Sequence, residues 1–168
     1  MREAQNTSAD GQAALKCELA GEVLRSFGNL RFTATGWSML PAIFPGDTLV
    51  VDRVFPNNVR IGDVVLVGRE GRLCAHRLIS AVADAECPTW ITQGDSMSRP
   101  DRPVFANELL GRVGYLIRAG RLIEVSAKLD VVETLVAKIV RHSTHAARAL
   151  VYLHEMVQTP EANLPCQE

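Results

Sequence analysis

The chain has 168 residues, of which 47% are hydrophobic, and its formal net charge at pH 7 is −1. This length and composition are enough for one domain with a sizeable core. A net charge so close to zero gives no overall basic field, so we expect no nucleic-acid partner.

A short amphipathic helix is predicted over residues 11–27, after a flexible segment at 1–10. Apolar side chains recur every four residues along it, at Leu15, Leu19, Val23 and Phe27, which is the spacing of one buried helical face. The amino terminus lacks the uninterrupted apolar core of a secretion signal. No stretch of the chain approaches the ~18 to 20 apolar residues that span a bilayer, so we expect a soluble protein without a transmembrane span.

From residue 30 to residue 125 the pattern changes to short runs of Val, Leu, Ile and Thr separated by Gly, Pro, Asn and Asp. This density of short strands and turns predicts a mainly β fold, either a barrel or a folded sheet. The expected strand segments are 30–35, 47–54, 63–80, 89–93 and 109–125. Glycine-bearing reversals within residues 69–72 and 118–120 predict two tight hairpins. With its leading helix, this block forms one predicted domain over residues 11–127.

A helical segment is predicted over residues 128–158, and Pro160 ends it. Its stripe, at steps of three and four, consists of Leu129, Val132, Val136, Ile139, Ser143, Ala146, Leu150, Leu153 and Val157. A coiled-coil dimer is one interpretation. Apolar residues beside the stripe favour a helix packed on its own domain, or an antiparallel hairpin bent near residues 142–145. Residues 159–168 are predicted to be a disordered tail.

The four cysteines, Cys17, Cys74, Cys87 and Cys166, are too scattered for a disulfide framework or a zinc site. Free thiols in a reducing compartment fit best, which favours the cytoplasm. His142 and His145 lie three residues apart on the predicted helix, but a solvated helix face is the favoured interpretation because no third ligand is evident. We expect no metal and no cofactor.

The stretch GWSMLPAIFPGD, residues 36–47, raises the question of whether Ser38 is a nucleophile or part of a turn. A serine hydroxyl attacks a carbonyl only when a base removes its proton. Of the four histidines, only His76 lies in the predicted β region. Its second ring nitrogen would need an acceptor to fix the tautomer, and the segment TQGDSMSRPDRPV offers Asp95 and Asp101.

The successive segments GWSMLPAIFPGDTLVVDRV, IGDVVLVGREGRLCAHRLI and ITQGDSMSRPDRPVFANELLGRV resemble the conserved boxes of type I signal peptidases and of the related LexA-like self-cleaving proteins. The resemblance covers about residues 30 to 118. It implies a β-rich fold with Ser38, in the Ser-Met-x-Pro box that includes Met39, as nucleophile. Most bacterial members have a lysine base at the position of His76, whereas the Ser-His members have a histidine there. In the Ser-His members an aspartate orients this histidine, and its position in this chain is Asp101.

Three other residues have supporting roles in this interpretation. Asp95, directly after Gly94, is expected to hold its loop through an Asx-type bond. Some members of the family carry an oxyanion-binding serine where this chain has Gly36, so the oxyanion would rely on backbone N–H groups, chiefly that of Ser38. Trp37 is either an apolar lip that meets substrate or lipid, which leaves peripheral membrane contact open, or a core residue.

The sequence thus predicts a soluble signal-peptidase-like serine endopeptidase that cleaves an extended peptide with small side chains near the cut, as the resemblance implies. A non-catalytic peptide-binding module and a self-cleaving regulator are the alternatives. Self-cleavage at Ala20-Gly21 is disfavoured because the bond lies in the predicted helix. A histidine base with an ordinary pKa predicts that hydrolysis rises through about pH 6 to 7.5.

Overall fold

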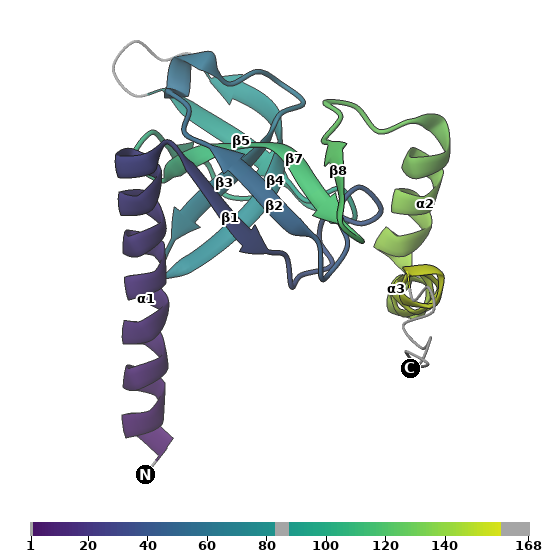
Figure 1. The fold of residues 1–168 in the computed structure, drawn as a ribbon, viewed down its shortest axis with the longest axis horizontal. Helices are drawn as coiled ribbons and strands as arrows, with labels where there is room; N and C mark the ends of the chain where they lie inside the picture. The colour runs from purple at the N-terminus through teal and green to yellow at the C-terminus, as the bar shows by residue number, and fades with distance from the viewer. Residues whose placement is uncertain (1, 83–87, 159–168) are drawn as a thin grey trace, which may run out of the picture.

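A computed structural model describes residues 2–82 and 88–158 of the chain (Figure 1). The N-terminal helix is α1 (Arg2–Phe27), and the C-terminal helices are α2 (Val131–His142) and α3 (Thr144–Gln158). The strands are β1 (Asn29–Thr33), β2 (Thr48–Asp52), β3 (Val64–Arg69), β4 (Arg72–Val82), β5 (Thr89–Gln93), β6 (Val104–Phe105), β7 (Leu109–Arg118) and β8 (Arg121–Glu124), with a 3-10 turn at Pro56–Asn58. The predicted tail at 159–168, Cys87 and Cys166 lie outside the described residues.

All eight strands belong to one antiparallel sheet in the order β1-β2-β7-β3-β4-β5-β6, with β8 paired to β7. The mainly β fold predicted from the sequence is therefore confirmed. The five predicted strand segments contain seven of the strands, and only the two-residue β6 was missed. This strand pairs with β5 at only two positions and is too short to show an alternating pattern.

The two predicted hairpins are also confirmed. Arg69 pairs with Arg72 across the β3–β4 turn, and Arg118 pairs with Arg121 across the β7–β8 turn. Both two-residue turns have positive φ throughout: Glu70 (50°) with Gly71 (75°), and Ala119 (47°) with Gly120 (75°). This left-handed conformation matches the twist of the flanking strands, and glycine adopts it without strain. The first hairpin places β4 beside β3 in the middle of the sheet.

Helix α1 differs from the prediction in length and in the face that it buries. It begins at Arg2 and so includes residues 2–10, predicted as flexible. Its buried residues are Ala20, Gly21 and Leu24, whereas Leu15, Leu19 and Phe27 are exposed. The predicted face was wrong because the helix packs on the sheet through Leu24, whose side chain lies in the main core cluster, and not through the Leu15–Leu19 stripe. Gly21 lies on the same face, where an added Cβ would be in ordinary contact with Leu110 of β7 (3.7 Å).

Two of the three core clusters lie within the β region. The larger one joins Leu24 of α1 to strands β2, β3 and β7 and to the loop over residues 34–47, termed the Ser38 loop. The second lies around Val65, Leu78 and Trp90. Together they fix β4, from which His76 extends, against both α1 and β5.

The C-terminal segment is broken at Ser143, where the backbone is extended (φ −146°, ψ 111°), as the hairpin interpretation predicted. The two helices cross rather than run antiparallel, since α3 is seen end-on where α2 is seen from the side (Figure 1). Asp130 begins α2 with a capping box to Glu133.

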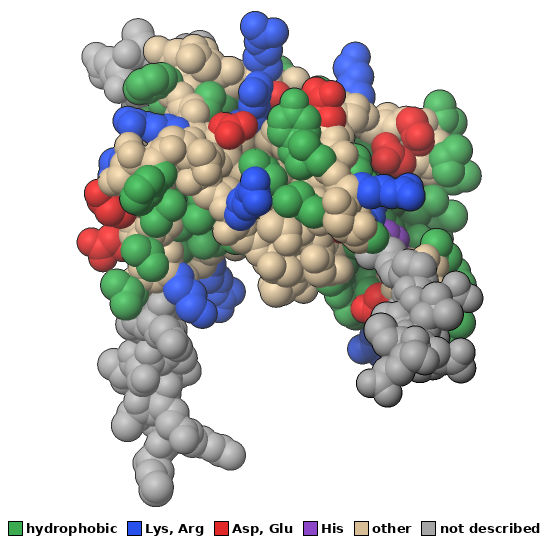
Figure 2. Space-filling model, viewed as in Figure 1, with side chains coloured by type: hydrophobic (Ala, Val, Ile, Leu, Met, Phe, Trp, Pro, Cys, Tyr) green, Lys and Arg blue, Asp and Glu red, His purple; other side chains and the backbone are tan. Residues whose placement is uncertain are grey.

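The predicted C-terminal stripe is corrected in the same way as that of α1. Val140, Ala147 and Val151 pack on Leu40 and Phe44, and Val136 and Leu150 of the predicted stripe pack against the same cluster. Val132, Ile139, Leu153 and Val157 of the predicted stripe are exposed, and Figure 2 shows hydrophobic side chains on the surface of these helices. The described helices include none that is both long and apolar enough to cross a bilayer.

Candidate active site

Ser38 lies in a turn-rich loop between β1 and β2, and hydrogen bonds close both of its ends. Backbone hydrogen bonds join the two ends of the loop: the Ala34 N–H donates to Asp47 O (2.8 Å), and the Gly46 N–H donates to Ala34 O (2.8 Å). The buried Asp47 carboxylate accepts from the Phe44 N–H (2.7 Å) and from the Arg118 guanidinium (2.6 and 2.8 Å). The Pro-Gly-Asp motif thus closes the Ser38 loop and fixes it to the sheet.

The interior of the loop is anchored on two sides. Met39 is buried in the main core cluster, and Leu40 is buried beneath α2 and α3. Across the loop, Ser96 donates from its N–H to Ser38 O (2.9 Å) and from its hydroxyl to Trp37 O (2.8 Å) and Ser38 O (3.0 Å). A Cβ on Gly94 would lie 2.6 Å from Ser38 O, so only glycine allows this close approach. Ser38 is thereby held in one position with its side chain half-buried.

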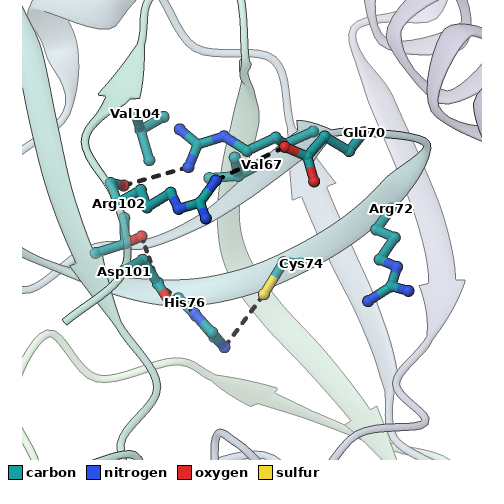
Figure 3. Close-up of a pocket in the computed structure, with 10 residues that line it drawn as sticks. Val67, Glu70, Arg72, Cys74, His76, Asp101, Arg102 and Val104 are labelled. Atoms are coloured by element: carbon teal, nitrogen blue, oxygen red, sulfur yellow. Dashed lines mark hydrogen bonds and ion pairs between the residues drawn. The ribbon is translucent and has the colours of Figure 1, made fainter. Parts of the chain in front are cut away.

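His76, on β4, lies between Ser38 and Asp101. Its Nε2 is 2.9 Å from Ser38 Oγ, and its Nδ1 is 2.5 Å from Asp101 Oδ2. Figure 3 shows His76 and Asp101 directed toward one another. Asp101 is itself held by Thr92, whose hydroxyl donates to Oδ2 (2.7 Å) and whose backbone O accepts from the Asp101 N–H (2.8 Å). The three residues predicted from the sequence are thus brought together within hydrogen-bond distance.

This geometry assigns the tautomer of the neutral imidazole. An ionised carboxylate only accepts, so the proton of His76 lies on Nδ1 and Nε2 is free to accept from the Ser38 hydroxyl. Partial burial favours the protonated form of Asp101, but the hydrogen bonds from His76 and Thr92 outweigh it and keep the pKa of this carboxyl below its usual range. Asp101 is therefore ionised wherever the imidazole is neutral.

The pKa of His76 is raised to about 9. Burial favours the neutral imidazole and lowers the pKa, but the hydrogen bond to Asp101 and the contact with Cys74 raise it by more. The expectation of an ordinary histidine pKa was therefore wrong, because the carboxylate that orients the ring also stabilises its protonated form.

Cys74 shares the face of β4 with His76, and its Sγ lies 3.2 Å from Nε2 (Figure 3). This is the nitrogen that also faces Ser38, so the thiol and the hydroxyl compete for one lone pair. Sequence analysis predicted free cysteines, and Cys17 and Cys74 are free thiols in the structure. The shared face of Cys74 and His76 follows from their spacing of two residues along a strand.

Asp95 contributes to the site through a different interaction from the predicted one. Its carboxylate forms a bidentate ion pair with Arg77 (2.8 Å to each oxygen), and both residues are buried. Arg77 also donates to Gly62 O (2.9 Å) and Ser126 O (2.7 Å). The ion pair of Asp95 with Arg77, the residue after His76 on β4, holds the 94–97 turn against this strand.

The other candidate site residues considered in the sequence analysis are all exposed. Gly36 is exposed, and a Cβ on it would meet no atom within 4 Å. Trp37 is 40% exposed, so it is a surface residue beside Ser38 rather than a core residue. His142 and His145 are exposed at the junction of α2 and α3.

Sequence analysis missed several residues that position the site: Arg77, Thr92, Ser96, Arg69 and Arg118. Arg69 pairs with Glu108 (2.6 Å to each oxygen) and also donates to the backbone oxygens of Arg102 (3.4 Å) and Pro103, which fixes the segment that carries Asp101. Nothing in a single sequence distinguishes an arginine in a strand that will hold the site from one that will not. Only the spacing of Arg77 directly after His76 could have drawn attention to it.

Two cavities adjoin the Ser38–His76 pair, termed the dyad. The first, termed the Ser38 cavity, measures about 420 Å³ and lies between residues 33–36 and residues 73–75, with Ser38 in its wall. The second, termed the His76 cavity, measures about 310 Å³, and His76, Asp101 and Thr92 line it together with arginines. Cys74 lines both. The dyad is therefore accessible to a bound chain from two sides.

The fold and the site together define a mainly β protein in which a serine, a histidine and an aspartate follow one another in space, each within hydrogen-bond distance of the next. A family model described as Peptidase S24-like matches residues 6–87, which include Ser38 and His76 but not Asp101. This match supports a relationship of residues 6–87 to the S24/LexA-like serine peptidase superfamily. Neither the curated proteins nor the solved structures include a match to it.

Proposed function

We propose that the protein is a serine endopeptidase that hydrolyses a peptide bond in an extended peptide. Ser38 is the nucleophile, His76 is the general base and then the general acid, and Asp101 orients His76. The observation that carries the proposal is the continuous arrangement Ser38–His76–Asp101, with distances of 2.9 and 2.5 Å. A binding module has no need of a nucleophile and base within hydrogen-bond distance in a cleft, so the geometry favours the enzyme.

The proposed reaction follows from these contacts. Ser38 Oγ bonds to the scissile carbonyl carbon as its proton passes to His76 Nε2. The C–N bond then breaks, and the same proton passes from Nε2 to the departing amine. Water, deprotonated by His76, then bonds to the acyl carbon, and the bond from this carbon to Ser38 Oγ breaks as His76 returns the proton to Oγ. The Ser38 N–H, and other backbone N–H groups at the exposed Gly36 turn, are the proposed oxyanion donors.

Cleavage in trans should depend on Ser38. We expect the purified protein to cut members of a library of proteome-derived peptides, and we expect Ser38→Ala to cut none of them, because removal of the nucleophile lowers serine-peptidase turnover by about 10⁶-fold. Mass spectrometry of the products gives the cleavage sites. Cuts that persist in Ser38→Ala would contradict the proposal.

The same incubation separates the peptidase from a self-processing regulator. The Ala20–Gly21 bond lies within α1, and both residues are buried against the domain. A peptide bond must be extended to enter such a site, so α1 would have to unwind first. We therefore expect the intact mass of the protein to stay constant, whereas a Ser38-dependent loss of the first 20 residues would favour the regulator.

The pH dependence of cleavage should report the raised pKa of His76. Only the neutral imidazole accepts the Ser38 proton, so below pH 9 we expect kcat/KM to rise about tenfold per pH unit and then to level off. Cys74→Ala removes one of the contacts that raise the pKa, so its profile should shift to lower pH. Both profiles should be measured from pH 6 to 10.5. Midpoints near 6.5 in both proteins, or profiles without a plateau, would contradict this assignment.

A further inference from the structure

The two cavities beside the dyad are neighbours, because Cys74 lines both. Ser38 lines one of them, and His76 with Asp101 lines the other. An extended peptide that occupies both cavities therefore passes Cys74.

The chemistry proposed for the dyad decides which part of the peptide lies in which cavity. After Ser38 attacks, the departing amine takes its proton from His76 Nε2, so the amine lies on the side of Ser38 where the imidazole is accessible. That side is the His76 cavity. The acyl part, which stays on Ser38, lies in the Ser38 cavity, and the residues after the scissile bond lie in the His76 cavity.

The His76 cavity has an apolar floor and a cationic rim. Val67 and Val104 line its floor. Arg69, Arg72 and Arg102, together with Glu70, line its rim. Arg69 is already neutralised by Glu108, at 2.6 Å. Figure 3 shows the other two arginines: a dashed line joins Arg102 to Glu70, and Arg72 lies apart from this pair.

The two remaining arginines outweigh the single carboxylate between them. Arg102 approaches Glu70 only to 4.0 Å, and the two side chains are 85% and 78% exposed, so this pair is weak. Arg72 is exposed and forms no ion pair with any residue that the structure describes. Asp101 is paired with His76. The exposed rim that consists of Arg72, Arg102 and Glu70 thus has a net positive charge, apart from the Asp101 carboxylate that His76 and Thr92 hold.

We infer that the His76 cavity binds the peptide after the scissile bond and selects an acidic side chain there through Arg72 and Arg102. This inference rests on the proposed peptidase function and names its substrate class. Arg72 lies four residues before His76 on β4, and a strand rises about 3.3 Å per residue, so their Cα atoms are about 13 Å apart. The acidic side chain therefore belongs two to four residues after the cut.

The test uses one sequence cleaved in the library, synthesised with Glu, Gln or Lys at the second, third or fourth position after the cut. We expect kcat/KM for the best Glu peptide to exceed that for its Lys counterpart about tenfold at low salt, and less at high salt. In Arg72→Glu/Arg102→Glu the preference should vanish or reverse. Arg31→Glu/Arg121→Glu, an equal charge change at exposed positions on β1 and in the β7–β8 hairpin, is the matched control and should keep the preference.

A binding measurement makes failure of this inference distinguishable from failure of the proposed function. Fluorescein-labelled peptides with four small residues followed by a Glu- or Lys-bearing segment are titrated against Ser38→Ala and followed by polarisation. Ser38-dependent cleavage at equal rates for Glu and Lys would overturn the acidic preference and leave the peptidase. Binding that favours Glu without cleavage by the wild type would overturn the peptidase and leave the preference. Neither cleavage nor a preference in binding would overturn both.

Discussion

Asp101→Asn is expected to lower kcat by about 10³- to 10⁴-fold while the protein stays folded. The amide that replaces the carboxylate can present an N–H to the imidazole, which favours the tautomer with the proton on Nε2. That nitrogen then cannot accept the Ser38 proton. The fold should persist because the backbone bond from residue 101 to Thr92 O does not involve the side chain.

The matched control for this substitution is Asp130→Asn. Asp130 caps α2, and asparagine is an equally good N-cap residue, so this variant should keep both stability and turnover. The pH profile gives a second measure, since loss of the Asp101 carboxylate removes a contact that raises the pKa of His76, and the residual activity should rise at lower pH than in the wild type. A kcat within tenfold of the wild type would show that Asp101 does not orient the base.

The strands could be predicted from the sequence because the information is local. Alternating apolar residues and glycine-bearing turns located β3, β4, β7 and β8 to within a few residues, since the side-chain period of a strand and the positive φ of a tight turn act over short distances. Ser38, His76 and Asp101 were likewise found, although they lie far apart along the chain. Their association came from the resemblance of three separate segments to family boxes rather than from periodicity.

The buried faces of the helices could not be predicted, because each helix offers more than one apolar face. Leu15 and Leu19 form the more hydrophobic stripe of α1, but the helix packs on the sheet through Ala20, Gly21 and Leu24. On α3, Ala147 and Val151 face Leu40 and Phe44, whereas Leu153 and Val157 of the predicted stripe are exposed. The choice depends on the shape of a partner surface that is distant in sequence.

The ion pairs around the site were also beyond sequence reasoning. Arg77 and Asp95 are 18 residues apart, and Arg118 and Asp47 are 71 residues apart. Nothing in the local pattern of an arginine predicts which carboxylate it will meet. The register of the sheet brings the partners of these ion pairs together, and the pairs in turn hold the Ser38 loop and the 94–97 turn in place.

Asp95→Asn is expected to destabilise the protein by about 3–5 kcal/mol, because it leaves the buried Arg77 guanidinium without its carboxylate. For a domain of this size that corresponds to a fall in Tm of roughly 10 °C. Thermal unfolding followed by circular dichroism measures it. Arg77→Met/Asp95→Leu, which removes both charges, should recover much of the loss, as replacement of a whole buried pair by apolar residues commonly does.

The Asp95 result also tests the division of roles between the two aspartates. Asp95 contacts β4 through Arg77 and does not contact the imidazole in the structure, whereas Asp101 lies 2.5 Å from His76 Nδ1. Measured well below its Tm, Asp95→Asn should therefore keep kcat within about tenfold of the wild type, because the dyad and its tautomer are unchanged. A loss of about 10³-fold or more at unchanged stability, together with an active Asp101→Asn, would reverse the two roles and make Asp95 the residue on which His76 depends.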